Sequence, residues 1–211
     1  MKDFLMKKLF WLKMVLFILC LLPLAIIVWD GFQNNLTADP IEEILHRTGI
    51  WALRLLLVTL LMTPLKIMTK LAVFIRLRRM LGLFTFFYAT LHLTTYLWLD
   101  IQFNWSQFFE DIIKRPYITV GMAAWFLMLP MAITSNKRMV RKLGKNWKRL
   151  HRAIYLVILL ACLHFLWLVK SDLNEPLIYS VIGLSLLFFR LFNYSYGKKP
   201  RNTPKTSQHT D

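Results

Sequence analysis

The sequence predicts an all-α, polytopic membrane protein whose six transmembrane helices form a bundle. The first observation is composition. Hydrophobic residues make up 57% of the 211 positions and charged residues 18%, whereas soluble domains have about 45–50% apolar and about 25% charged residues. The second is a set of six long apolar windows, and the third is the concentration of Lys and Arg in alternate connecting segments.

The six windows are each close to the roughly 20 residues that a transmembrane helix needs. They cover about residues 10–29, 50–68, 80–99, 117–134, 149–169 and 176–194. We expect one transmembrane domain over residues 1–194, with no repeat period, and a polar, disordered tail over residues 195–211. No small-x-small cleavage site follows the first window, so we expect that window to stay as a membrane anchor.

The basic residues predict the orientation of the chain. Of the 27 Lys and Arg residues, 21 lie in residues 1–13, 66–79, 135–152 and 195–211. Cytoplasmic segments are the ones rich in Lys and Arg, so both termini are expected in the cytoplasm. The net charge of +16 then reflects topology and contact with membrane lipids. No nucleic-acid partner is expected, because the charge does not lie on one face of a soluble module.

The sequence lacks the motifs of several other reaction classes. Cys20 and Cys162 both lie in apolar windows, where we expect them to pack and not to form a disulfide or a thiolate metal site. The chain has no G-x-G-x-x-G or Walker phosphate loop, no H-E-x-x-H and no serine nucleophile elbow. Hydrolytic and nucleotide chemistry are not expected, and no catalytic residue is predicted.

Three histidines in the apolar windows form the candidate site: His92, His151 and His164. Ionisable groups are costly in a bilayer and are mostly functional there. For each histidine alone, a neutral ring hydrogen-bonded between two helices is the structural alternative. Imidazole is a good ligand of haem iron, and helical bundles hold cofactors with inward side chains. We therefore predict a haem-binding bundle in which these three histidines are the candidate cofactor-binding residues and ligands of the iron.

Depth along the helices separates these histidines. Counted from the inner ends of their windows at about 1.5 Å per residue, His92 lies ~18 Å deep, His164 ~25 Å and His151 ~6 Å. His92 and His164 are the expected axial pair, in the outer half, and His151 could hold or touch a second cofactor near the inner face. On a straight helix, thirteen residues rotate His151 by ~140° away from His164, so both rings would not point the same way.

Three further ionisable residues lie near the ends of the windows. His46 is expected at the interface, close to the acids of residues 39–43, with contact to a substrate or partner as the alternative. Arg54 and Arg190 are expected to extend their charged ends to the interface. A haem propionate would be the functional partner of either arginine.

Five segments within about residues 37–180 carry a resemblance to a known family. They read IEEILHRTGIWALRLLLVTLLMTPL, RLRRMLGLFTFFYATLHLTTYLWLD, KRPYITVGMAAW, TSNKRMVRKLGKNWKRLHRAIYLV and EPLIY. Through them the chain resembles the MsrQ (YedZ) family, the haem-binding membrane subunits of the bacterial periplasmic methionine sulfoxide reductase system. That family belongs to the ferric-reductase-like transmembrane group.

The resemblance implies a bacterial inner-membrane protein with b-type haem and FMN. It implies that electrons pass from the quinone pool to a separate periplasmic molybdopterin-containing reductase, MsrP, which repairs oxidised periplasmic proteins. The family's haem histidines match His92, His151 and His164, and His46 also matches a family histidine. The third window has one histidine where the larger oxidases of the group have two, which argues against a simple ladder of two haems.

A transporter that uses the histidines for protons or metal ions is the alternative function. Transporters commonly have helices broken at corresponding places in two halves, and Pro23 and Pro130 do not correspond in this way. A purely structural anchor is a third possibility, but it leaves three deep histidines unexplained. The visible spectrum of the purified protein distinguishes these functions.

The segment DIQFNWSQFFEDIIKRP is the candidate contact for a periplasmic partner. It combines aromatic anchors with a charged rim, as protein interfaces do. The residues concerned are Trp105, Phe108, Phe109, Glu110 and Asp111. The alternative is an amphipathic helix that lies on the outer leaflet.

Overall fold

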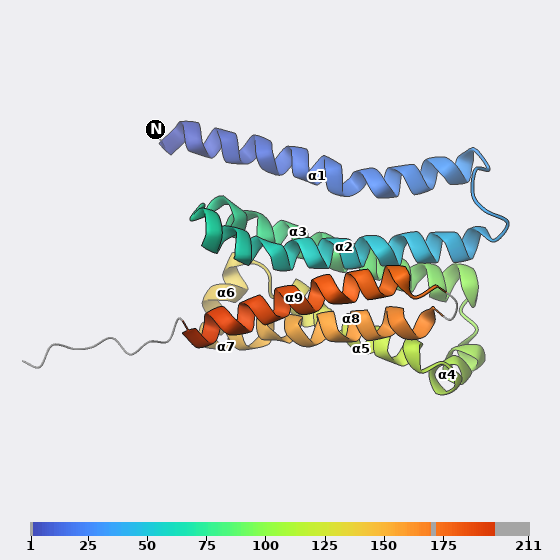
Figure 1. Cartoon of the computed structure of the whole chain (residues 1–211). Helices are drawn as coiled ribbons and strands as arrows, with labels where there is room; N and C mark the ends of the chain where they lie inside the picture. The colour runs from blue at the N-terminus through green and yellow to red at the C-terminus, as the bar shows by residue number, and fades with distance from the viewer. Residues whose placement is uncertain (1, 170–171, 197–211) are drawn as a thin grey trace, which may run out of the picture.

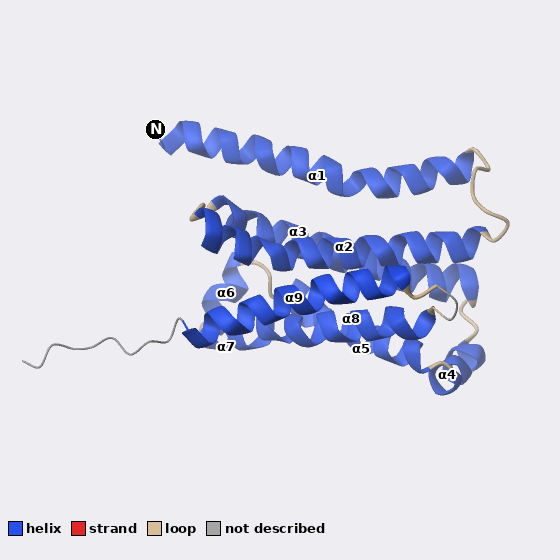
Figure 2. Ribbon diagram, viewed as in Figure 1, coloured by secondary structure: helices blue, strands red, loops and turns tan. Residues whose placement is uncertain are grey.

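We describe the chain from a computed structural model, which places residues 2–169 and 172–196. Every regular element within these residues is a helix, as Figure 2 shows, so the predicted all-α class is confirmed. The elements are α1 (Lys2–Phe32), α2 (Pro40–Thr69), α3 (Val73–Thr95), η1 (Tyr96–Asp100), α4 (Trp105–Lys114), α5 (Pro116–Ile133), α6 (Lys137–Leu143), α7 (Lys145–Leu150), η2 (His151–Ala153), α8 (Ile154–Leu168) and α9 (Asn174–Tyr196). Residues 195 and 196 continue α9, and the rest of the predicted disordered tail, residues 197–211, lies outside the described residues.

Six helical segments are long and apolar enough to cross a membrane, which confirms the six predicted windows. They are Leu9–Phe32, Pro40–Thr69, Val73–Asp100, Pro116–Ile133, Lys145–Leu168 and Asn174–Asn193. A helix satisfies its own backbone hydrogen bonds, as a chain within lipid must. The protein is therefore a multi-pass membrane protein.

The long helices run side by side between two ends of the bundle (Figure 1). We call one the basic end, which comprises residues 66–79 and 135–152 and includes α6 and α7. The other, the acidic end, comprises residues 30–47, 100–116 and 172–175 and includes α4. The start of α1 and the close of α9 both lie at the basic end in Figure 1.

Helix α2 is the centre of the bundle, because its two sides belong to two different buried clusters. One side packs on α8, with Leu56, Leu60 and Val157 among the most buried residues. The other side packs on α1 and α3, around Tyr88. Cys20 and Cys162 are both buried and unpaired, one in each cluster, so their predicted packing role is confirmed.

Tyr88 replaces a helical hydrogen bond of α1 next to Pro23. In a regular helix the N–H of Leu24 would donate to the carbonyl of Cys20, four residues earlier. Here the Tyr88 hydroxyl takes both partners: it accepts from Leu24 N at 3.1 Å and donates to Cys20 O at 2.7 Å. A side chain inserted beside a proline is a recognised cause of helix bending, and α1 bends along its length in Figure 1.

Arg190 has a similar function beside Pro64 of α2. Proline has no N–H, so the Leu60 carbonyl loses its helical donor, and Arg190 Nη2 donates to that carbonyl at 2.7 Å. The same nitrogen donates to Thr63 Oγ1 at 2.7 Å. Arg190 is only 6% exposed. The prediction that it extends to the interface is therefore wrong, because its guanidinium is needed between α9 and α2.

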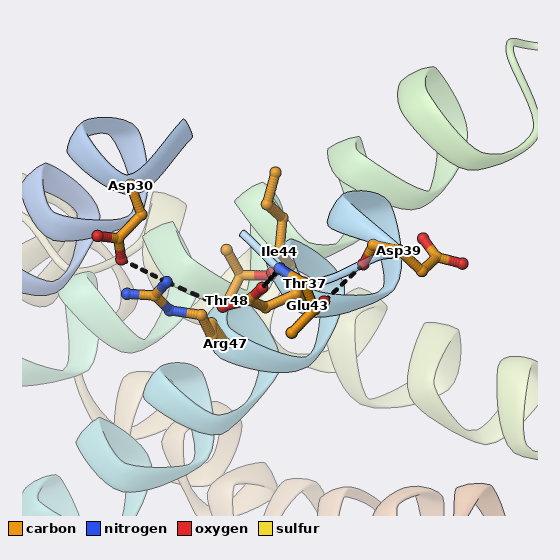
Figure 3. Close-up of polar contacts among 7 residues, drawn as sticks. All are labelled: Asp30, Thr37, Asp39, Glu43, Ile44, Arg47 and Thr48. Carbon is orange, nitrogen blue, oxygen red and sulfur yellow. Dashed lines mark hydrogen bonds and ion pairs between the residues drawn. The ribbon is translucent and has the colours of Figure 1, made fainter. Parts of the chain in front are cut away.

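At the acidic end, polar contacts fasten α1 to α2 (Figure 3). Arg47 Nη1 lies 2.7 Å from Asp30 Oδ2 of α1 and 3.2 Å from Glu43 Oε1 of its own helix. Asp39 caps α2 by accepting from Glu42 N at 3.0 Å. This cap, with Pro40 at the first helical position, explains why α2 begins ten residues before the predicted window.

Candidate functional site

His92 lies on α3 and is held by α2. Its Nδ1 is 2.8 Å from the carbonyl oxygen of Leu45. A carbonyl can only accept, so Nδ1 carries the proton and donates, and Nε2 keeps its lone pair. One turn beyond Leu45, Gly49 leaves room for the ring, because a Cβ there would stand 3.1 Å from its Nδ1 and Cε1 atoms.

His164 lies on α8 and is held by α5 in the same way. Its Nδ1 donates to the carbonyl oxygen of Tyr117 at 2.7 Å. One turn further along α5, a Cβ at Gly121 would stand 2.7 Å from Nδ1 and 2.9 Å from Cε1. Such a contact is too short for an alanine, so the position of the His164 ring depends on this glycine.

The two arrangements repeat along the chain, contrary to the expectation of no repeat. In both, 47 residues separate the histidine from its carbonyl partner. Each corresponding pair is 72 residues apart (117 minus 45, 121 minus 49 and 164 minus 92). The pairs are Leu45 and Tyr117, Gly49 and Gly121, and His92 and His164. The strings ATLH and ACLH end at the two histidines, so α2–α3 and α5–α8 build equivalent halves of one site.

The two histidine rings face each other between these halves, as their depths predicted. Their centroids are 6.1 Å apart and their planes cross at 84°. Two nitrogen ligands on opposite sides of one metal, each at about 2.0 Å, would be about 4 Å apart, with the ring centres farther out. The separation of the ring centres is of the size that two imidazoles bound to one metal would have. Metal-binding histidines typically donate their other N–H to a carbonyl in this way.

His151 is not part of this pair. It opens η2, the single 3₁₀ turn between α7 and α8. Its Nδ1 lies 3.1 Å from the carbonyl of Trp147 in its own preceding turn, and the two rings stack with centroids 3.9 Å apart. The break at η2 means that His151 and His164 do not lie on one straight helix, as the rotation argument assumed. His151 lies at the basic end, alone among the three predicted ligands.

The donor set limits what the site can bind. Among residues 2–169 and 172–196, no group of three or more His, Cys, Asp or Glu side chains could hold a metal ion. Two opposed imidazoles suit a metal whose remaining ligands come from a macrocycle, such as haem.

A second polar cluster joins α2 and α9 near the histidine pair. His46 Nε2 and Arg54 Nη2 each lie 3.9 Å from the Glu175 carboxylate, and Arg54 Nε donates to the Tyr179 hydroxyl at 2.7 Å. The contact with Glu175 adds a partner to the acids of residues 39–43 that were expected near His46. Its acidic partner comes from another helix. Phe165, next to His164, contacts the His46 and Tyr179 rings at centroid distances of 6.2 and 6.3 Å.

Helix α4 presents only part of the predicted docking surface. Trp105 and Phe109 are exposed, as expected, and so is Glu110. Phe108 and Asp111 are buried, at 9% and 5% exposed, so the expectations of Phe108 as an exposed anchor and of Asp111 on the charged rim are wrong. Asp111 is buried because it accepts from the Tyr96 hydroxyl at 3.0 Å and pairs with Arg115 at 3.2 Å.

Sequence reasoning missed the glycines and the α9 residues of these sites. The signal for Gly49 and Gly121 was the shared spacing of 43 residues to His92 and His164 (92 minus 49 and 164 minus 121). No comparable signal linked Glu175 or Tyr179 to α2, because those contacts depend on how α9 packs.

Comparisons with known proteins agree on one family. The model of the ferric reductase like transmembrane component matches residues 48–162. A protein-methionine-sulfoxide reductase heme-binding subunit MsrQ from Xanthomonas campestris is 56% identical over 178 residues, which are 82% of each chain. The MsrQ of Herminiimonas arsenicoxydans is 44% identical over 194 residues, 90% of this chain and 88% of its own. No solved structure matches significantly. The chain thus belongs to the MsrQ family of ferric-reductase-like transmembrane proteins.

Proposed function

We propose that this protein is the membrane electron-transfer subunit of a methionine sulfoxide reductase system. It takes electrons from the quinone pool, passes them through b-type haem and delivers them to the periplasmic molybdenum-dependent reductase MsrP, a separate protein that carries out the repair reaction. The observation that carries the proposal is the pair of opposed histidines, His92 and His164, each with Nε2 unused. The relatives' name, heme-binding subunit, supports it.

In this proposal His92 and His164 would hold the haem through its iron. Bound haem supplies a centre that accepts and releases one electron at a time. The Leu45 and Tyr117 carbonyls keep each ring in the tautomer whose Nε2 can coordinate, and they prevent the rings from rotating. With two protein nitrogens available to the iron, such a site would be suited to electron transfer and not to binding a third ligand.

In the proposal, His151 at the basic end belongs to the route by which electrons enter.

FMN is the second cofactor of the proposal. It rests on the resemblance of the sequence to the family. The phosphate of FMN is negatively charged, and a buried arginine among the described residues offers the opposite charge. Arg190 lies on the basic-end half of α9, and its Nε has no hydrogen-bond partner. Buried charges are normally paired, so an anionic group near Arg190 would satisfy that atom.

The orientation follows from charge. We place the protein in the bacterial inner membrane with the basic end in the cytoplasm, because Lys and Arg are retained on the cytoplasmic side. Both termini are then cytoplasmic, and the histidine pair and α4 lie toward the periplasm. This is the side on which MsrP would receive electrons.

The direct test is the visible spectrum of the purified protein before and after dithionite. We expect a Soret band and a sharp α band on reduction, with the haem content measured as the pyridine haemochrome. A folded, monodisperse and colourless preparation from haem-supplemented cells would rule out the carrier and favour the transporter.

A further inference from the structure

Arg190 is a buried cation without an acidic partner in the part of the chain that the structure describes. It is 6% exposed, and its two hydrogen bonds at 2.7 Å go to neutral acceptors, the Leu60 carbonyl and the Thr63 hydroxyl. None of the ion pairs found within residues 2–169 and 172–196 includes it. A guanidinium does not lose its proton in a protein, and a buried charge is costly unless it is paired. The position therefore lacks an anion.

A second arginine adds to this lack of negative charge. Arg78, near the start of α3, lies close enough to Arg190 for the two positive charges to repel each other. The segments that form the basic end, residues 66–79 and 135–152, contain no Asp or Glu. Charges interact more strongly inside a protein than in water. An anion between the two guanidinium groups would therefore stabilise the packing of α3 and α9.

Two side chains from the segment around α8 complete the cluster. The Tyr155 ring centre lies 6.0 Å from the guanidinium carbon of Arg190, and Tyr155 is also near Arg78. Its hydroxyl can donate a hydrogen bond to an anion. His151, one turn before Tyr155, is near Arg78 as well. Arg78 is half-buried whereas Arg190 is enclosed, so the cluster extends from the interior of the bundle to its surface.

The chemistry of the cluster selects a phosphate group. A phosphate monoester carries about two negative charges at neutral pH, which match the two guanidinium groups, whereas a single carboxylate would leave one of them unpaired. The planar fork of arginine fits phosphate oxygens with parallel N–H donors. Basic pockets between transmembrane helices on the cytoplasmic side bind the head groups of anionic lipids such as cardiolipin.

We propose that Arg78, Arg190 and Tyr155 form a binding site for a phosphate group at the basic end of the bundle. Two sources have this chemistry: the phosphate of FMN and the head group of cardiolipin. The flavin source rests on the proposed function, in which FMN is a cofactor, and it would place the phosphate near His151, where electrons enter. The lipid source is independent of the proposed function.

The first arm of the test compares FMN with riboflavin, which has the same ring system but no phosphate. Flavin-free, full-length protein in phosphatidylcholine nanodiscs is titrated with each, and quenching of flavin fluorescence gives the dissociation constants. If FMN is the source, it should bind the wild type about tenfold more tightly than riboflavin, the worth of one hydrogen bond to a charged group. Arg78→Met should remove most of that difference, and Tyr155→Phe should remove less.

The second arm replaces the flavin by cardiolipin. Native mass spectrometry of the protein released from mixtures of cardiolipin and phosphatidylcholine measures which lipid is retained. If cardiolipin is the source, the wild type should retain it in preference, and Arg78→Met should lower that preference by about tenfold. A preference for FMN alone assigns the site to the flavin, one for cardiolipin alone assigns it to the lipid, and either result supports the phosphate site.

The matched controls are Arg76→Met and Arg79→Met. They remove the same charge from the same turn of α3, but both side chains are exposed. Their affinities should equal those of the wild type. Arg190→Met also removes the bonds to α2, so the test depends on Arg78→Met. Without flavin or cardiolipin, Arg78→Met should raise the apparent unfolding temperature, because it removes the repulsion from Arg190, and Arg76→Met should not.

Three results would overturn the site. The first is a wild type that prefers neither FMN to riboflavin nor cardiolipin to phosphatidylcholine. The second is a loss of preference in Arg78→Met no larger than in Arg76→Met, and the third is a lower unfolding temperature for ligand-free Arg78→Met than for the wild type.

The same samples separate this site from the proposed function. Haem content is recorded for every variant, and we expect it to be unchanged. A wild type without haem would overturn the proposed function and leave the lipid source standing. A haem-loaded protein without any preference for a phosphate would overturn the phosphate site alone.

Discussion

His164 and His151 lie on the same membrane-spanning segment, yet they are held in opposite ways. The Nδ1 of His164 donates to a carbonyl of α5, 47 residues away in the chain, at 2.7 Å. The Nδ1 of His151 lies 3.1 Å from a carbonyl only four residues away, and its ring stacks on Trp147 of the preceding turn. The first contact exists only when α5 and α8 are packed together. The second is local, although the His151 ring also approaches the backbone of Met131 on α5.

The comparison teaches that a histidine's packing partner, in addition to its depth, distinguishes a preorganised ligand position. Helix α4 shows the same contrast. Asp111 is buried against Tyr96 of η1, whereas its neighbour Glu110 is exposed and hydrogen-bonds to Lys114 one turn away. Residues held by another element should therefore be more sensitive to substitution than those held locally.

The largest expected effect is loss of haem when either member of the pair is removed. His92→Ala and His164→Ala should each abolish most of the haem, since each removes one axial ligand. His151→Ala should keep part of the haem signal and slow the entry of electrons. Pyridine haemochrome content per protein and stopped-flow reduction measure the two effects. If His151→Ala lost all haem while His164→Ala kept it, His151 and not His164 would be the essential ligand.

The next effect tests the support of the rings without touching the ligands. Gly121→Ala should lower haem affinity by about 10- to 100-fold, as changes to the partners of metal ligands do, because the new methyl group would overlap the His164 ring. Gly49→Ala should have a smaller effect, because its contact of 3.1 Å is longer. The control is Gly82→Ala, whose Cβ would meet only Thr59 Cγ2 at 3.6 Å. Haem titration of the apoprotein gives the affinities, and equal values for all three would refute the role of the glycines.

A third effect sharpens the comparison within α4. Asp111→Ala should cost about 1.5–3 kcal/mol of stability, the typical value for a hydrogen bond to a charged group, because it leaves the Tyr96 hydroxyl without its acceptor. Glu110→Ala should not change stability measurably, because exposed ion pairs contribute little. The apparent unfolding temperature in detergent measures both. A larger loss of stability in Glu110→Ala than in Asp111→Ala would contradict the expectation that the buried carboxylate contributes more than the exposed one.

The smallest effect concerns the delivery of electrons. Glu110→Lys should leave haem content and haem reduction intact and slow reoxidation by the periplasmic partner, most visibly at low salt, where steering between charges is least screened. The hydrogen bond from Lys114 lowers the pKa of Glu110 below its ordinary value of 4.5. The carboxylate keeps its charge above that pH, so the effect should be constant through neutral pH. If Glu110→Lys were reoxidised as fast as the wild type at every salt concentration, α4 would not be the docking surface, and the alternative of an amphipathic helix on the outer leaflet would remain.

Much of the fold could be predicted from the sequence, and so could the closeness of the His92 and His164 rings. The six spans follow from runs of apolar residues, and counting residues along helices was enough to match the depths of His92 and His164. The errors concern partners on other helices. Arg190 was expected at the interface because the carbonyl that Pro64 frees cannot be seen in α9 itself. The acidic partner of His46, Glu175, lies 129 residues away (175 minus 46).

The sequence by itself determined which segments enter the membrane, since the free energy of transfer into lipid is close to a sum over the residues of one segment. It also determined the two basic and acidic ends, because loop charge is equally local. Only the tertiary structure decided which side chains meet within the bundle. Lipid provides no hydrophobic force between helices, so their association depends on close packing and interhelical hydrogen bonds. Gly49 and Gly121 permit that packing, and the carbonyls of Leu45 and Tyr117 supply those bonds to His92 and His164.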